Sequence, residues 1–178
     1  MARANKRDEV LEAIVTIIER EGLTPVTLDA VAVETGMTRA GLLYHFPSRE
    51  ALIAATHRHL TELWERDLAS SAGKAAAEAT DQERHEAYVR VCTNSARRVE
   101  LLLMLESAED GEVANLWQQV IERWAPRVPA VGDTQGVDRF IARLAADGLW
   151  INEALSAQPI SDDLRAAIIA RLLQLMSE

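Results

Sequence analysis

The sequence predicts an all-α protein, with a small N-terminal domain of three helices followed by a larger helical domain. Apolar residues recur at intervals of three and four along nearly the whole chain, and no alternating β pattern persists. Glycine and proline interrupt this periodicity where helices would end, and Ser or Thr precedes several apolar runs as a candidate N-cap. The 178 residues are enough to bury a core without disulfides or metals.

Three helices are predicted in the N-terminal part. The first runs over about residues 5–21 and ends at Gly22, which suits a C-terminal cap. A short helix over about 27–35 ends at Gly36, and another short helix follows over about 39–45. Two short helices around a glycine turn, preceded by a third helix, form the helix-turn-helix architecture. This domain is predicted to span residues 1–48.

The second domain is predicted to span residues 49–178, and its first helix, Arg49 to Leu68, links the two domains. Residues 70–80 are rich in alanine and small polar residues and are predicted to form a loose connection. Proline and glycine divide the remaining periodic segments into helices. These are expected over about 81–94, 96–107, 111–124, 137–155 and 162–176.

The helix over 39–45 is predicted to present an outward face that suits DNA. Arg39 has the length and charge to reach guanine O6 and N7, and Ala40 is small enough to contact a thymine methyl group. Hydroxyl, imidazole and basic side chains around it suit phosphate contacts. For each of these side chains, a solvated or purely structural role is the open alternative. The predicted DNA-binding residues are Lys6, Thr27, Thr38, Arg39, Ala40, Gly41, Leu43, Tyr44, His45 and Arg49.

The stretch TLDAVAVETGMTRAGLLYHFPSREAL resembles the signature of the tetracycline-repressor (TetR) family. The resemblance rests on an ordered set of residues, each weak alone. These are Thr27, Val31-Ala32, Gly36, Thr38, Tyr44-His45-Phe46 and Arg49-Glu50.

The resemblance implies a helical DNA-binding domain and a larger helical domain that binds an effector and dimerises. It further implies a regulator, usually a repressor, that is released by a small, mostly apolar ligand, and we expect it to bind a palindromic operator. The single cysteine, Cys92, fits a reduced compartment and predicts a cytoplasmic protein. Two positions depart from the family pattern. Leu43 stands where the family often has a phosphate-binding tyrosine, and Arg49 stands where it often has lysine.

The net charge of −9 at first argues against a nucleic-acid partner. The charge is unevenly distributed, however. Through residue 60, seven Lys/Arg stand against eight Asp/Glu, so this part carries −1 and the rest of the chain −8. The nearly neutral N-terminal part therefore remains compatible with DNA.

Aromatic and sulfur-containing side chains of the second domain are candidates for an effector cavity, because such cavities are mostly apolar. Ordinary core packing is the open alternative for each of them. The predicted cavity residues are Met104, Leu105, Trp117, Ile121, Trp124 and Trp150.

The last two predicted helices carry a wider apolar band than packing on one side requires. Surplus apolar surface on terminal helices favours a two-fold interface between identical chains. The predicted dimer residues are Phe140, Leu144, Gly148, Ile151, Leu155, Leu164, Ile168, Leu172 and Leu175.

Candidate residues for catalysis are few, and the sequence predicts neither an enzyme nor a metal site or other cofactor. His57 and His59 are two residues apart and diverge on a helix, Cys92 has no paired histidine, and the eight glycines form no phosphate-binding loop. No apolar stretch approaches the ~20 residues that span a bilayer. A helical protein-interaction module with a degenerate DNA-binding motif is the alternative function, favoured by Leu43 and the acidic balance.

Overall fold

The computed structural model describes residues 6–94, 96–107, 111–156 and 159–177. These residues form helices and loops without a strand, which confirms the predicted all-α class. They divide into two compact units. The first unit contains the described residues of 1–62 and 99–116, and the second contains those of 63–98 and 117–178. The division at residue 48 between a DNA-binding domain and an effector-binding domain stays a prediction.

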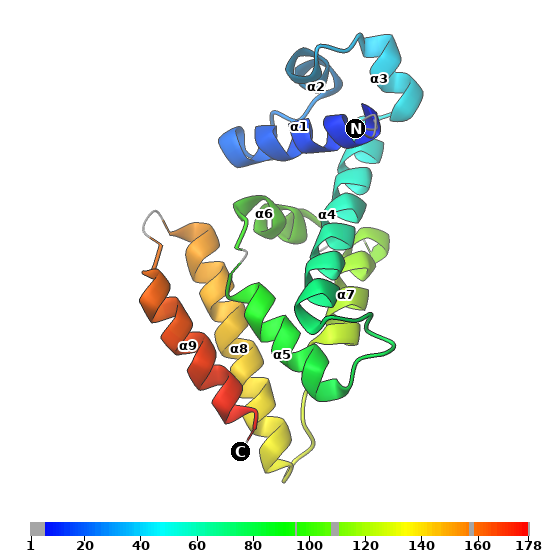
Figure 1. Cartoon of the computed structure of the whole chain (residues 1–178). Coiled ribbons are helices and arrows are strands. Elements are labelled where there is room, and N and C mark those ends of the chain that lie inside the picture. Colours follow the sequence, from blue (N-terminus) through cyan, green and yellow to red (C-terminus); the bar gives the residue numbers. More distant parts are fainter. Residues whose placement is uncertain (1–5, 95, 108–110, 157–158, 178) are drawn as a thin grey trace. The chain divides into compact units, whose positions relative to one another are not determined.

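The first unit opens with three helices, α1 (Lys6–Glu21), α2 (Leu28–Thr35) and α3 (Arg39–His45) (Figure 1). The start predicted at Asn5 lies outside the described residues. α1 packs on α2, and α2 packs on α3. The apolar stripes of these helices meet in one core, where each of the following side chains is at most 2% exposed: Val10, Ile14, Ile17, Val31, Leu42 and Phe46.

The turn between α2 and α3 depends on glycine. Gly36 has φ of 66°, in the left-handed region, and its N–H donates to the carbonyl of Val33 at 3.3 Å. A side chain at this φ would strain the backbone, so the predicted glycine turn is confirmed.

α4 (Arg49–Ala72) begins after Ser48, whose Oγ accepts a hydrogen bond from the N–H of Ala51 at 3.2 Å. The helix ends one turn beyond the predicted Leu68, so the prediction of a loose connection from residue 70 is wrong at its start. Gly73, with φ of 72°, ends the helix, and its N–H donates to the carbonyl of Ser70 at 3.2 Å. Helices α6 (Arg98–Glu106) and α7 (Gly111–Trp124) follow later in the chain.

The second unit is built on α5 (Asp81–Cys92), α8 (Thr134–Leu155) and α9 (Asp162–Leu175), with parts of α4 and α7. α5 contacts both α8 and α9, and α8 lies beside α9 (Figure 1). Small residues on α8 permit the close approach of α5. The core of this unit includes Leu68, Tyr88, Val120, Trp124, Ala142 and Ala146.

Two helix starts of the second unit are fixed by side-chain caps. At α5, Thr80 Oγ1 accepts from the N–H of Glu83, while Glu83 Oε2 accepts from the N–H of Thr80 at 2.8 Å. Hydrogen bonds from the Lys74 ammonium and from Thr80 lower the pKa of Glu83 to about 2. At α8, Asp133 Oδ1 accepts from the N–H of Gly136 at 2.9 Å, so this helix begins one turn before the predicted residue 137.

Candidate nucleic-acid interface

The two helices of the motif are each held at their start by a threonine. Thr27 Oγ1 accepts from the N–H of Ala30 at 3.1 Å, and Thr38 Oγ1 accepts from the N–H of Gly41 at 3.1 Å. Each cap satisfies a backbone donor that the helix itself leaves unpaired. Both threonines are exposed, and each hydroxyl acts as an acceptor in its cap. Its hydrogen therefore remains available to a phosphate.

α3 has one buried and one exposed face. Leu42 is buried in the core of the first unit, and Phe46 directly after the helix is buried with it. The exposed face carries chemically diverse side chains, of which Tyr44 is 86% exposed. The exposed residues are Arg39, Ala40, Leu43, Tyr44 and His45. The segment that sequence reasoning assigned to DNA therefore faces solvent.

Gly41 donates its N–H to the capping hydroxyl of Thr38. A Cβ atom at this position would lie 3.2 Å from Thr38 Oγ1, a tight contact that a shift of a few tenths of an ångström would relieve. The absence of a side chain at Gly41 leaves the backbone of α3 uncovered at this point.

Arg39 is held by an acidic residue that the sequence reasoning missed. Its Nη1 lies 2.5 Å and 2.7 Å from the two carboxylate oxygens of Asp29. Asp29 lies in the first turn of α2, and the two side chains remain 59% (Arg39) and 70% (Asp29) exposed. Exposed pairs of this kind are worth about 0.2–1 kcal/mol, so the pair orients the guanidinium without locking it.

Tyr44 and His45 form the exposed end of α3. Their rings meet edge to face with centroids 5.2 Å apart. Both side chains are exposed, which leaves the phenol and the imidazole accessible to a partner. Leu43, which departs from the family pattern, is 38% exposed on the same helix.

The guanidinium of Arg49, which was predicted to bind a DNA phosphate, is bonded within the protein. Its Nε donates to the carbonyl of Val26 at 2.8 Å, and its Nη2 donates to the carbonyl of Leu23 at 3.2 Å. The guanidinium therefore fastens the loop before α2 to the start of α4. Lys6 is exposed on the first turn of α1, where its predicted DNA contact stays a prediction.

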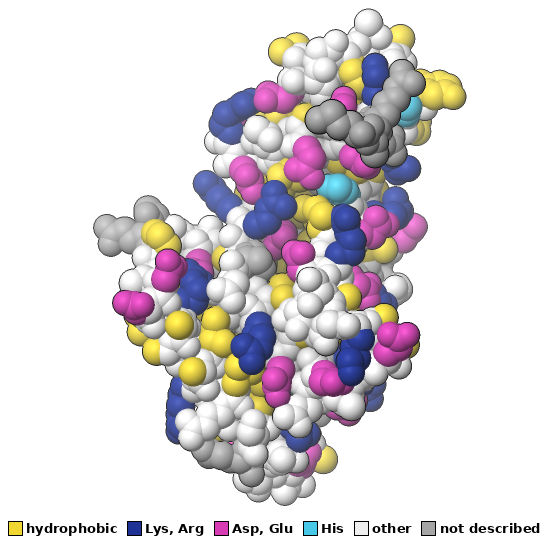
Figure 2. All heavy atoms as spheres, in the orientation of Figure 1, with side chains coloured by type: hydrophobic (Ala, Val, Ile, Leu, Met, Phe, Trp, Pro, Cys, Tyr) yellow, Lys and Arg dark blue, Asp and Glu magenta, His cyan; other side chains and the backbone are white. Residues whose placement is uncertain are grey.

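Acidic and basic side chains are interspersed over the face of the chain drawn in Figure 2. Attraction to a polyanion on such a surface depends on particular side chains rather than on a broad basic field. The predicted DNA contacts therefore rest on Arg39 and Lys6 rather than on the net charge of −9.

The predicted effector residues fall in both units. Met104 is half-buried and Leu105 is 66% exposed, and both belong to α6 in the first unit. In the second unit, Trp117 and Trp124 are buried. The half-buried Ile121 and Trp150 complete the predicted set in this unit.

Three aromatic rings of the second unit form a cluster that includes one predicted residue. Trp64 lies 6.1 Å from Trp117 and 6.0 Å from Tyr88, measured between ring centroids. The hydroxyl of Tyr88 donates to Asp147 Oδ1 at 2.8 Å. Burial raises the pKa of Asp147, and the donors Tyr88 and Arg143 only partly offset this. We call Trp64, Tyr88, Trp117 and Asp147 the aromatic cluster.

α8 carries an exposed apolar stripe in the second unit. Its side chains recur at intervals of three and four residues, and they are 42–70% exposed from Ile141 to Leu155. Leu164 of α9 is 50% exposed. The stripe on α8 consists of Ile141, Leu144, Gly148, Ile151 and Leu155.

Of the other predicted dimer residues, Phe140, Ile168 and Leu175 are half-buried. Leu172 belongs to the core of the unit and is only 8% exposed, so it offers little surface to a partner. Sequence periodicity did not distinguish Leu172 from its neighbours because both faces of α9 are apolar.

Within the described ranges, no group of three or more His, Cys, Asp or Glu side chains is arranged to hold a metal ion. None of the described helices combines the length and the apolar character needed to cross a membrane.

Comparison with known families gives two matches that together cover most of the chain. The family described as "Bacterial regulatory proteins, tetR family" matches residues 10–56. The family described as "Tetracyclin repressor-like, C-terminal domain" matches residues 82–177.

Individual proteins give the same result. The HTH-type transcriptional regulator BetI of Paraburkholderia xenovorans is 27% identical over 180 residues, covering 93% of this chain and 89% of that protein. A transcriptional regulator from Saccharomonospora viridis, solved in complex with choline, has a TM-score of 0.68 and 19% identity, covering 99% of this chain and 97% of that one. The multidrug binding protein EbrR, solved with malachite green, has a TM-score of 0.62 and 17% identity, with coverage of 93% and 96%.

Proposed function

The chain belongs to the TetR family of transcription regulators, and from this premise we propose that it is a ligand-responsive repressor that binds a palindromic operator as a homodimer. The observation that carries the proposal is the exposed face of α3, with Arg39 at its start and Tyr44 and His45 at its end. Members of the family regulate transcription and are not enzymes. The chain acts in the cytoplasm, where the chromosome is accessible.

In the proposed complex, α3 enters the major groove. Arg39 reads a guanine through its O6 and N7 atoms, and Ala40 contacts a thymine methyl group. The hydroxyls of Thr27 and Thr38, together with His45, bind phosphates and set the register. Lys6 adds a phosphate contact from the start of α1.

The homodimer forms through the apolar stripe on α8 together with Leu164 of α9. A stripe of this kind is self-complementary under a two-fold axis, as an isologous interface requires. Two copies of α3 then meet half-sites about 34 Å apart, or a multiple of that distance.

The effector combines an apolar body with a positive charge. The faces of the three rings in the aromatic cluster are the groups that would attract a cation. The carboxylate of Asp147 is paired with Arg143 at 3.5 Å, so the rings rather than this carboxylate carry the proposal. Choline and malachite green, the ligands of the two solved relatives, are organic cations, which supports this class. The effector causes release because it binds better to a dimer whose two α3 helices no longer fit the operator.

The test uses duplexes selected by the full-length protein from a random library. Choline is titrated into the protein–operator complex, and its neutral isostere 3,3-dimethylbutan-1-ol serves as the matched control. The proposal expects release by choline and not by the isostere. Equal release by both compounds would refute the cationic class. Failure to select any duplex would refute the repressor and favour the interaction module.

A further inference from the structure

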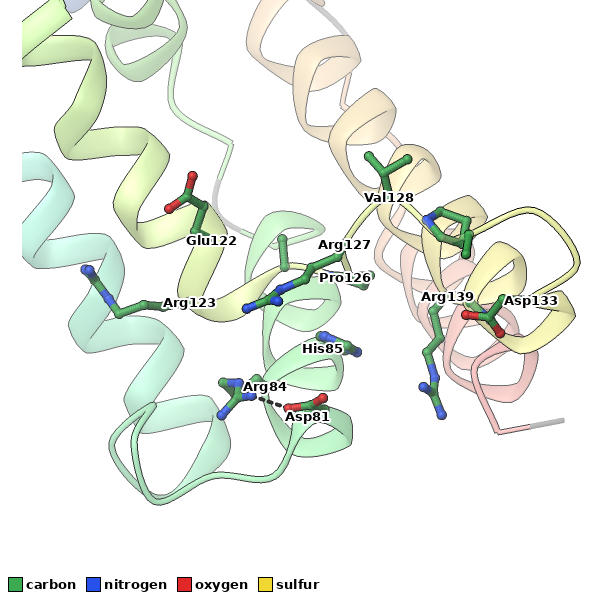
Figure 3. Close-up of a pocket in the computed structure, with 14 residues that line it drawn as sticks. Asp81, Arg84, His85, Glu122, Arg123, Pro126, Arg127, Val128, Asp133 and Arg139 are labelled. Atoms are coloured by element: carbon green, nitrogen blue, oxygen red, sulfur yellow. Dashed lines mark hydrogen bonds and ion pairs between the residues drawn. The ribbon is translucent and has the colours of Figure 1, made fainter.

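A pocket lined largely by charged residues lies within the second unit. Its volume is about 310 Å³, and it is lined by the first turn of α5, the end of α7, the following loop and the start of α8 (Figure 3). We propose that this pocket binds a small dianionic oxyanion, such as inorganic phosphate or a short dicarboxylate.

Four arginines line the pocket, and two of them are already engaged within the protein. Arg84 pairs with Asp81, and Arg123 pairs with Glu65. Arg127, in the loop after α7, and Arg139, on α8, have no hydrogen-bond or ion-pair partner among the described residues. Two guanidinium groups are therefore available to a ligand.

None of the three acidic residues that line the pocket forms an ion pair with Arg127 or Arg139. Asp81 is occupied by Arg84, as the dashed line in Figure 3 marks. Asp133 caps α8 by accepting from the N–H of Gly136. Glu122 accepts from Gln118 Nε2 at 3.3 Å. Asp133 and Glu122 keep their negative charges, because the groups that donate to them are neutral. Four arginines nevertheless stand against three carboxylates, so the lining residues carry a formal charge of +1.

His85 of α5 adds an unsatisfied polar atom. Its Nδ1 is buried and has no hydrogen-bond partner. Burial lowers the pKa of His85 to about 4; Asp81 opposes this, whereas the positive charges of Arg139, Arg84 and Arg127 reinforce it. The ring is therefore neutral at neutral pH, and one of its nitrogens carries a proton to donate. A buried polar atom without a partner is uncommon in folded proteins, and a ligand oxygen would satisfy it.

These groups select for oxygen anions rather than for apolar ligands. A guanidinium binds carboxylate or phosphate through parallel hydrogen bonds, and two guanidiniums favour a ligand with two negative charges. The volume lies at the lower end of the range of about 300–1,000 Å³ that is typical of small-molecule sites. The ligand is therefore small, and it differs in charge from the effector proposed above.

The test is isothermal titration of the full-length protein without DNA, so it does not depend on the proposed repressor. Phosphate and succinate are titrated separately at constant ionic strength. The variants are Arg127→Gln and Arg139→Gln. Arg90→Gln, which removes an exposed arginine outside the pocket, is the matched control.

The proposal expects saturable binding of at least one anion with one site per chain. Each pocket variant weakens this binding by at least about tenfold, because a charge-assisted hydrogen bond is lost, while Arg90→Gln leaves it unchanged. The imidazole NMR signals of His85 in the natural protein shift with the same saturation curve. Saturation by phosphate alone or succinate alone identifies which kind of oxyanion the site takes.

Two results would overturn the proposal. One is the absence of saturable binding by either anion at concentrations well above millimolar. The other is binding that all three variants weaken equally, which would indicate a general charge effect.

Discussion

Replacing Arg39 with alanine removes the guanidinium that α3 presents at its exposed start. In the structure, Nη1 alone contacts the carboxylate of Asp29, so Nε and Nη2 remain free to bind a base. Arg39 can therefore keep its ion pair with Asp29 and at the same time donate two hydrogen bonds, from Nε and Nη2, to a guanine. A bidentate contact of this kind is worth about 1–3 kcal/mol per half-site, which corresponds to a loss of about 5- to 150-fold in affinity for each of the two half-sites that the homodimer contacts.

The ion pair between Arg39 and Asp29 changes the expected loss of binding free energy only a little. Because both side chains are more than half exposed, the pair contributes about 0.2–1 kcal/mol, less than the base contact. Asp29→Asn is therefore expected to reduce discrimination at the same base pair by less than Arg39→Ala does. The double variant is expected to resemble Arg39→Ala, because Asp29 acts through the arginine.

The assay is fluorescence anisotropy with the selected operator and with duplexes changed at single base pairs. Arg20→Ala is the matched control, since Arg20 is also an exposed, ion-paired arginine of the first unit, bound to Glu34 at 3.1 Å. The reasoning is refuted if the Arg39 variant binds as tightly as the natural protein. It is also refuted if the two arginine variants lose the same affinity, or if the loss is identical on every duplex.

Three further predictions concern stability and assembly. Arg49→Gln should lower the free energy of unfolding by about 1.5–3 kcal/mol, measured by urea titration, because two carbonyls lose a charged donor; an unchanged urea midpoint would contradict this. Leu144→Glu should weaken the dimer by at least about 2 kcal/mol in sedimentation equilibrium, whereas Val131→Glu, an exposed change outside the stripe, should not; equal dimerisation of both variants would exclude the α8 interface. The pKa of His85 is 6.5 in the unfolded chain and about 4 in the folded protein. The neutral ring therefore contributes fully to the free energy of unfolding above pH 6.5, and this contribution is lost as the pH falls from 6.5 to 4. His85→Gln should remove this pH dependence from the free energy of unfolding. The change should amount to less than about 3 kcal/mol, because the ring is only partly buried. The same pH dependence in both proteins would contradict a buried neutral ring.

Features with local causes were predictable from the sequence. A glycine that must adopt positive φ and threonines that cap helix starts act within a few residues, so α2, the turn at Gly36 and α3 were placed correctly. The end of α4 was missed because Gly73 stands in a stretch of alanine and serine that gives no apolar period. The start of α8 was missed because Asp133 caps the helix before its apolar period begins.

Features that depend on tertiary geometry were not predictable in the same way. Asp29 lies ten residues before Arg39 on another helix, and only the angle between α2 and α3 brings the two together. Arg49 bonds carbonyls 23 and 26 residues earlier, so its structural role leaves no trace in local spacing. Trp64 was overlooked beside Trp117 because the two residues are separated by more than fifty positions. The predicted DNA, effector and dimer contacts themselves stay predictions.

Dimethyl sulfate protection of a selected duplex tests most directly whether α3 reads the major groove, because this reagent methylates guanine at N7, in that groove. The account predicts N7 protection in two symmetric half-sites whose centres are about 10 base pairs apart, or a multiple of that. Arg39→Ala should restore methylation at one guanine in each half-site. Unprotected N7 atoms throughout a duplex that the protein nevertheless binds tightly would contradict the account.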